Sequence, residues 1–327
     1  MALEQSEQTL HLMEQLPRNQ RERLFHIDFR LYFLGELRRS DLVERFETGP
    51  AGATRDIAIY RVMAPENLQL DQTTKAYLPT PTFVPLFEHH PQRVLTALSQ
   101  GFGEGITVGS QPMMRCEYPS AISLPEMSVL APITRAIHRG KAVSLNYTSI
   151  DSGKTTREIV PLALVDTGIR WHARAFDRKS RQFRDFVLTR IEEPVVIEDG
   201  PVEREETAEF DVQWSRLIEL ELVPHPAHAR PEVVRLDYEM PDGVLRVKLR
   251  AANAGYILRR WNVDCSRDHS LRGPEYALWL ADPLALYGAS SASLAPGYQD
   301  PRPEGERRVV RALQGRVTRS NLSPGRL

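Results

Sequence analysis

Residues 168–191 have the sequence GIRWHARAFDRKSRQFRDFVLTRI, in which aromatic and aliphatic residues alternate with charged ones on both sides of a polar turn. This alternation predicts a β-hairpin with its turn near residues 177–180. Successive side chains of a strand point to opposite faces, so His172 and Arg174 are expected on one face and Trp171 on the other. We assign Trp171 to the core.

The hairpin carries an excess of positive charge. Residues 170–190 contain seven Lys and Arg against two Asp, whereas the whole chain of 327 residues has a formal net charge of -1. A guanidinium group matches phosphate oxygens with two parallel hydrogen bonds. The hairpin therefore indicates an anion site, for a nucleotide or a nucleic-acid backbone, and a solvated hairpin of alternating charges is the alternative. Pairing of the polar faces is expected to bring four side chains onto one surface: His172, Arg174, Arg184 and Arg190.

The segments RWHARAF (residues 170–176) and FRDFVLTRI (residues 183–191) resemble the core of a WYL domain. Trp171, His172 and Ala173 stand in the place of the Trp-Tyr-Leu triplet, of which only the Trp is kept. The variant with His in second place is similar to bacterial WYL regulators that sit beside phage-defence operons. The resemblance is specific over residues 130–195. It implies a homodimeric transcription factor with an N-terminal winged helix and a C-terminal extension.

The residues before the hairpin fit a small antiparallel β domain. A helix is expected over residues 129–139, followed by strands over 142–148 and 157–165 with tight turns between them. By resemblance, this domain would be a small Sm/SH3-like β-barrel. Its ligand pocket would use a Tyr of the first strand as a stacking surface, basic hairpin residues to hold phosphate, and a His that donates to an oxygen. That gives six ligand-binding candidates: Tyr147, Ser149, His172, Arg174, Arg184 and Arg190.

Three short helices are predicted in the N-terminal third, over residues 19–34, 41–46 and 53–63. Gly35 is expected to end the first helix and Ser40 to cap the second. A tight turn before the third helix is typical of a helix-turn-helix, and residues 68–71 and 75–78 fit the strands of a wing.

In this arrangement the third helix would enter the major groove. Residues 19–63 contain eight Arg against seven acidic residues, a weak excess for a DNA-binding unit, so a dimerisation or docking module is the alternative. Side chains of the third helix would reach base edges, and the remaining candidates would touch phosphate. The DNA-binding candidates are Arg38, Arg39, Thr54, Arg55, Arg61 and Lys75.

The whole chain is expected to be a multidomain α+β protein. Its predicted parts are a winged helix-turn-helix domain (1–80), a helical linker (81–128), the WYL-like barrel (129–200), a connecting helix (201–230), an α+β extension (231–300) and a basic tail (301–327). The linker helix is placed at 87–99 and the connecting helix at 210–222. In the extension, extended segments at 233–238, 244–249 and 276–280 accompany a helix at 251–261. The histidine pairs at 89–90 and 225/228 lack further ligands and are assigned to the surface.

The composition limits the classes of protein. No apolar run is long enough to cross a bilayer, and the acidic N-terminus does not resemble a signal peptide. Cys116 and Cys265 form no disulfide framework, suit a reducing cytoplasm and are expected to be buried thiols. No P-loop, HExxH motif or nucleophile motif is present, so we do not expect an enzyme. Neither a cofactor nor a metal is expected.

The predicted function is therefore a repressor that binds double-stranded operator DNA and an anionic ligand as a homodimer. An enzyme acting on nucleotides or nucleic acid through the same basic pocket, and an accessory subunit of a defence complex, are the alternatives.

Overall fold

The computed structural model describes residues 13–102, 113–117 and 122–302. The chain divides after Pro119 into two compact units. Of the predicted basic tail, only residues 301 and 302 lie within the described part. No helix in these ranges is long and apolar enough to span a membrane. Nor does any group of three or more His, Cys, Asp or Glu side chains there have a metal-binding arrangement.

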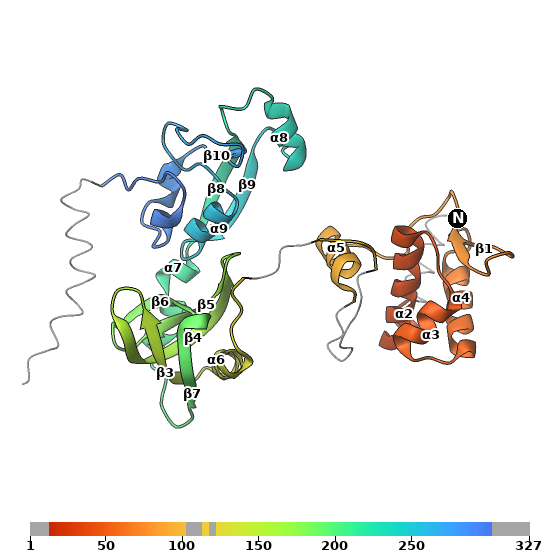
Figure 1. Cartoon of the computed structure of the whole chain (residues 1–327), viewed down its shortest axis with the longest axis horizontal. Coiled ribbons are helices and arrows are strands. Elements are labelled where there is room, and N and C mark those ends of the chain that lie inside the picture. Colours follow the sequence, from red (N-terminus) through yellow and green to blue (C-terminus); the bar gives the residue numbers. More distant parts are fainter. Residues whose placement is uncertain (1–12, 103–112, 118–121, 303–327) are drawn as a thin grey trace, which may run out of the picture. The chain divides into compact units, whose positions relative to one another are not determined.

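The first unit is a helix-turn-helix with a short wing (Figure 1). The two wing strands pair antiparallel, with Leu70 opposite Tyr77. The predicted helices and wing are thus confirmed, although the linker helix begins at Pro91 and not at residue 87. The elements are α2 (Arg18–Phe29), a π-helical turn (Arg30–Leu34), α3 (Arg39–Phe46), α4 (Pro50–Met63), β1 (Leu68–Leu70), β2 (Tyr77–Pro79) and α5 (Pro91–Gln100).

The ends of these helices follow local chemistry. Gly35 has a φ of 73° after the π-helical turn, a left-handed conformation that favours glycine, and it ends the first helix as predicted. Ser40 does not cap α3; the helix begins at Arg39, and the backbone N–H of Arg38 donates to the Asp41 carboxylate at 2.7 Å. Pro50 starts α4 three residues earlier than predicted, because a proline fits the first helical turn.

A buried carboxylate, that of Asp28 on α2, ties α4 to the rest of the first unit. Asp28 accepts hydrogen bonds from the Tyr60 hydroxyl of α4 at 2.5 Å and from the backbone N–H of Leu86 at 2.9 Å. His89 Nε2 lies 2.8 Å from the same carboxylate, and its side chain is 4% exposed, so the surface assignment of His89 was wrong. A second link joins α2 to α4 through Arg23 and Asp56 at 2.6 Å. These bonds fix the orientation of α4.

The second unit begins with α6 and an antiparallel sheet of five strands, in the order β6-β5-β4-β3-β7. The helix and the hairpin are confirmed. The predicted Sm/SH3-like barrel is not confirmed, because within the described residues the edge strands β6 and β7 do not pair with each other and the sheet does not close. Side chains of α6 such as Ile133 pack on Val143 and Leu145 of the sheet. The elements are α6 (Met127–Arg139), β3 (Ala142–Ser149), β4 (Gly153–Asp166), β5 (Trp171–Asp177), β6 (Gln182–Val187) and β7 (Ile191–Ile197).

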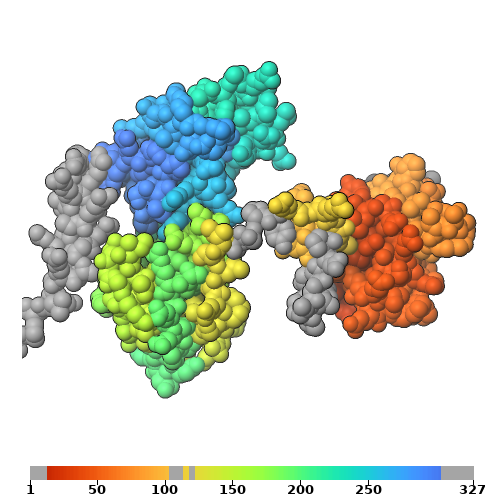
Figure 2. Space-filling view, in the orientation of Figure 1, coloured from red at the N-terminus to blue at the C-terminus, as the bar shows by residue number. Residues whose placement is uncertain are grey.

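A three-stranded sheet of order β10-β8-β9 forms the C-terminal part of the same unit. In Figure 2 the blue surface of this C-terminal part adjoins the green surface of the part that holds the five-stranded sheet. The predicted strand 244–249 and helix 251–261 correspond to β9 and α9, but the segment 233–238 is helical. The elements are α7 (Val212–Ser215), β8 (Leu217–Pro224), α8 (Pro231–Asp237), β9 (Leu245–Arg250), α9 (Ala254–Arg260) and β10 (Leu278–Leu280).

Three further predictions, about the C-terminal half and the cysteines, were wrong. Residues 217–222 form a strand and not a helix, because buried Ile218, Leu220 and Leu222 alternate with exposed residues. His225 is buried, with Nε2 3.1 Å from the Asp264 carboxylate, and so does not belong to a surface linker. Cys265 is buried as predicted, whereas Cys116 is exposed.

Candidate functional site

One face of α4 is exposed and the other is packed into the first unit. Ala53, Ile57 and Tyr60 are buried at helical spacing, whereas Thr54 and Arg55 are exposed. The packed face carries the contacts to α2, so the exposed face is held in a fixed orientation. Every predicted DNA-binding residue is exposed: Arg38, Arg39, Thr54, Arg55, Arg61 and Lys75.

The exposed cations among these candidates lie on α4, at the start of α3 and at the tip of the wing. The Arg61 guanidinium carbon lies 5.7 Å from the ring centre of Tyr77, so α4 and β2 contact each other through a cation–π interaction. Lys75 lies in the turn between the wing strands, with a φ of 58°. This distribution is that of a winged helix, in which one helix reads a groove and the wing contacts the backbone.

The hairpin of the second unit keeps the predicted alternation but not the predicted pairing. Ala173 and Ala175 belong to the core under α6, and His172 and Arg174 are buried on the other face. Arg174 lies opposite Asp185, and Ala175 lies opposite Arg184. Directly opposite residues share a face, so Arg184 lies on the other side of the sheet from Arg174, and its predicted place on the common surface was wrong.

One more expectation about the hairpin side chains differs from the structure. Trp171 is the first residue of β5 and is 37% exposed, so its assignment to the core was wrong. The exposed Arg184 donates from Nη2 to the Gln182 side chain at 3.3 Å. It therefore lies apart from the buried polar residues of β5.

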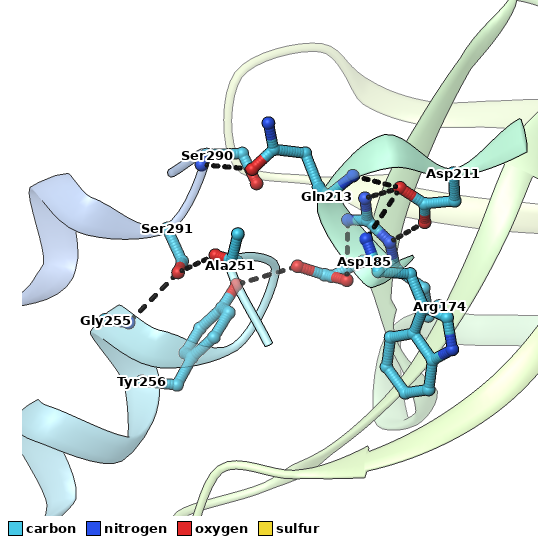
Figure 3. Close-up of polar contacts among 10 residues, drawn as sticks. Arg174, Asp185, Asp211, Gln213, Ala251, Gly255, Tyr256, Ser290 and Ser291 are labelled. Atoms are coloured by element: carbon cyan, nitrogen blue, oxygen red, sulfur yellow. Dashed lines mark hydrogen bonds and ion pairs between the residues drawn. The ribbon is translucent and has the colours of Figure 1, made fainter. Parts of the chain in front are cut away.

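Two carboxylates hold Arg174 (Figure 3). Its Nε and Nη2 donate to Asp211 at 2.7 and 3.0 Å, and its Nη1 donates to Asp185 at 3.1 Å. Asp185 also accepts a hydrogen bond from the Tyr256 hydroxyl of α9 at 3.3 Å. Arg174 thus joins two strands of the sheet to the C-terminal part.

His172 lies beside this ion-pair cluster. Its ring centre is 5.3 Å from that of Tyr256, and among the described residues its Nδ1 has no hydrogen-bond partner. Burial lowers the pKa of His172; the Asp185 charge opposes this shift, and the charges of Arg170 and Arg190 add to it. Burial, followed by the Asp185 charge, raises the pKa of Tyr256 to about 12. His172 and Tyr256 are therefore both neutral at pH 7.

Arg170 and Arg190 form the cationic rim of this site. Both are half-buried, and in the described part of the chain neither forms an ion pair. Two positive charges without an ion-pair partner in the described ranges therefore lie near His172.

The other two predicted ligand residues have structural contacts. The Tyr147 hydroxyl accepts a hydrogen bond from the Val187 N–H at 3.3 Å, and its ring meets Phe186 edge-on at 4.9 Å. With 8% of its surface exposed, Tyr147 offers no free face for stacking. Ser149 Oγ accepts the N–H of Asp151 at 3.1 Å in the β3–β4 turn.

The structure brings His172, Arg174 and the rim residue Arg190 together. The sequence reasoning missed Asp185, Asp211 and Tyr256 as part of the site. Asp185 lies inside the segment 183–191 that resembles a WYL domain, and Asp211 stands directly before a helix that it caps, a common position for Asp. For Tyr256 the sequence held no signal.

Family models match three consecutive parts of the chain. Residues 19–100 match the BrxR transcriptional regulator winged helix-turn-helix domain, residues 128–196 the WYL domain, and residues 217–286 the BrxR transcriptional regulator C-terminal dimerization domain. The DNA-binding transcriptional repressor CapW of Escherichia coli (strain KTE188) is 31% identical over 276 residues, which cover 80% of this chain and 88% of that protein. The chain belongs to this family of WYL-domain transcriptional regulators. The resemblance seen in the hairpin is thereby confirmed.

Other relatives of this WYL-domain regulator carry the same description. The DNA-binding transcriptional repressor CapW of Stenotrophomonas maltophilia is 32% identical over 255 residues, covering 75% of this chain and 84% of its own length. The DNA-binding transcriptional repressor CapW of Pseudomonas aeruginosa is 29% identical over 271 residues, which cover 78% of this chain and 86% of that protein. Among solved structures, proteasome accessory factor B/C of Arthrobacter aurescens has 17% identity and a TM-score of 0.27, covering 84% of this chain and 45% of that chain.

Proposed function

We propose that this WYL-domain regulator is a DNA-binding transcriptional repressor of a phage-defence operon, and that an anionic ligand controls it. The exposed face of α4, held rigidly by its buried face, is the observation that carries the proposal. The CapW relatives, named DNA-binding transcriptional repressors, support it. The match to a dimerization domain supports a homodimer that binds two half-sites.

The proposed division of labour follows the two units. Residues 1–80 read the operator: Thr54, Arg55 and Arg61 approach base edges, while the remaining candidates contact phosphate. Residues 129–200 sense the ligand, which is a nucleotide, an oligonucleotide or single-stranded nucleic acid. In this assignment the rim, Arg170 and Arg190, attracts the phosphates, and the protein acts by binding rather than by catalysis.

A mobility-shift assay with DNA from upstream of the protein's own operon tests the function. The protein should prefer this DNA over a scrambled duplex, and its affinity should fall steeply as salt rises, because phosphate contacts release counterions. Equal affinity for both duplexes would contradict operator recognition.

Lys75→Ala should weaken binding to both duplexes alike. The lysine lies at the wing tip and is exposed, where it fits a phosphate contact. The slope of log affinity against log salt should fall by about 1, the value for one lost phosphate contact. The measurement is the same assay at four salt concentrations. An unchanged slope would remove Lys75 from the interface.

A further inference from the structure

Asp211 holds Arg174 in the geometry with which a guanidinium also binds phosphate. Two parallel bonds, of 2.7 and 3.0 Å, join Nε and Nη2 of Arg174 to the two carboxylate oxygens (Figure 3). Both side chains are almost fully buried. Asp211 therefore occupies the edge of Arg174 that an anionic ligand would need.

The same Asp211 belongs to the C-terminal part through α7. Its Oδ1 accepts the backbone N–H groups of Gln213 and Trp214, both at 3.1 Å. The Gln213 side chain in turn donates to the Gly288 carbonyl at 3.1 Å and accepts the Ser290 N–H at 2.8 Å. Movement of Asp211 away from Arg174 would thus move α7 and the loop that α7 holds.

Tyr256 gives the C-terminal part a second contact on the same face of the sheet. The backbone just before it packs closely on Ser291: a Cβ on Gly255 would lie 1.8 Å from the Ser291 carbonyl oxygen, and the Gly255 N–H donates to Ser291 Oγ at 3.0 Å. The Tyr256 ring covers His172, and its hydroxyl donates to Asp185. The C-terminal part therefore lies directly over the polar residues of the hairpin.

The charges around Arg174 do not balance. Asp185 and Asp211 face one guanidinium and a neutral histidine, while the two rim cations have no ion pair in the described ranges. An incoming phosphate would gain attraction from the rim and compete with Asp211 for Arg174. The unpartnered Nδ1 of buried His172 offers it a further hydrogen-bonding position.

We propose that Asp211 is an internal substitute for the ligand, which a phosphate-bearing molecule displaces from Arg174. The displacement releases α7, and α7 carries the change to the C-terminal part. This inference rests on the proposed function, in which the hairpin site senses an anion. One guanidinium edge cannot hold both partners, so ligand binding and the docked position of α7 exclude each other.

Asp211→Asn tests the displacement in the full-length protein. Asparagine keeps an oxygen for the α7 cap but loses the charge that holds Arg174. Calorimetric titration with inorganic pyrophosphate, and with a 5′-phosphorylated thymidine tetranucleotide, should show binding roughly tenfold or more tighter than in the wild type, because a competing anion is gone. Equal or weaker affinity of the variant, or no binding of either probe to it, would overturn the proposal.

Asp166→Asn is the matched control. It removes the same charge at another contact between the sheet and the C-terminal part, where Asp166 lies 3.4 Å from Arg260. The affinity for both probes should stay at the wild-type value. An increase equal to that of Asp211→Asn would mean that general charge, and not release of Arg174, sets the affinity.

Hydrogen exchange in the wild type gives a second readout. Saturating tetranucleotide should speed exchange of the Gln213 and Trp214 amides, which Asp211 caps. Unchanged exchange at these amides would refute the release of α7. Operator binding is measured separately, in the absence of either probe. If the protein did not bind the operator, the repressor proposal would be contradicted, but the displacement of Asp211 by a phosphate-bearing ligand would not.

Discussion

Arg174→Ala should lower the free energy of unfolding of the second unit by about 3–5 kcal/mol, the usual cost of removing one partner from a buried ion pair. The substitution leaves Asp211, which is 1% exposed, without its cation, and it removes a bond to Asp185. All four tryptophans of the chain lie in residues 171–279. Denaturation followed by tryptophan fluorescence therefore reports on this unit alone.

Arg184→Ala provides the comparison for that measurement. Arg184 lies on the neighbouring strand of the same sheet but is exposed, and its guanidinium donates to the Gln182 side chain. Its removal should change the unfolding free energy by no more than about 0.5 kcal/mol, as for most surface substitutions. If the two variants lost equal stability, the buried ion pair would not be what joins the sheet to the C-terminal part.

Arg174 and Arg184 show which features of the hairpin could be predicted from the sequence and which could not. Alternation correctly separated Ala173 from Arg174, because the two faces of a strand follow from backbone geometry alone. The partner across the hairpin depends on where the turn closes, and a shift of one residue moves Arg184 to the opposite face. The burial of Arg174 depends on Asp211, 37 residues further along the chain. No local pattern contains that contact.

Strand β8 is a different case, because its signal was present in the sequence. In residues 218–222 the apolar Ile218, Leu220 and Leu222 alternate with Glu219 and Glu221, and the three apolar side chains face the core. This period of two is that of a half-buried strand, and the prediction of a helix gave it too little weight. In the first unit the helix signals were longer and the turns clearer, so the three helices and the wing were found.

Arg55→Ala should weaken binding to the operator about tenfold to a hundredfold, which corresponds to about 1–3 kcal/mol for a base contact, and should change binding to scrambled DNA much less. Arg55 is exposed in the second turn of α4, on the helix face opposite the buried Ile57 and Tyr60. Because the bonds from Asp28 and Arg23 hold that buried face, removal of the Arg55 side chain should leave the fold unchanged. The mobility-shift assay measures both affinities, and circular dichroism checks the fold.

Arg93→Ala separates a contact at α4 from a general effect of charge. Arg93 is exposed on α5, in the same unit, and its loss changes the net charge by the same amount. The operator affinity of the Arg93→Ala variant should stay close to that of the wild type. The small loss of long-range electrostatic attraction to DNA should disappear as salt screens it. Two equal losses would mean that the first unit attracts DNA only through its overall charge. Wild-type affinity of Arg55→Ala at every salt concentration would instead show that the exposed face of α4 does not read the operator through Arg55.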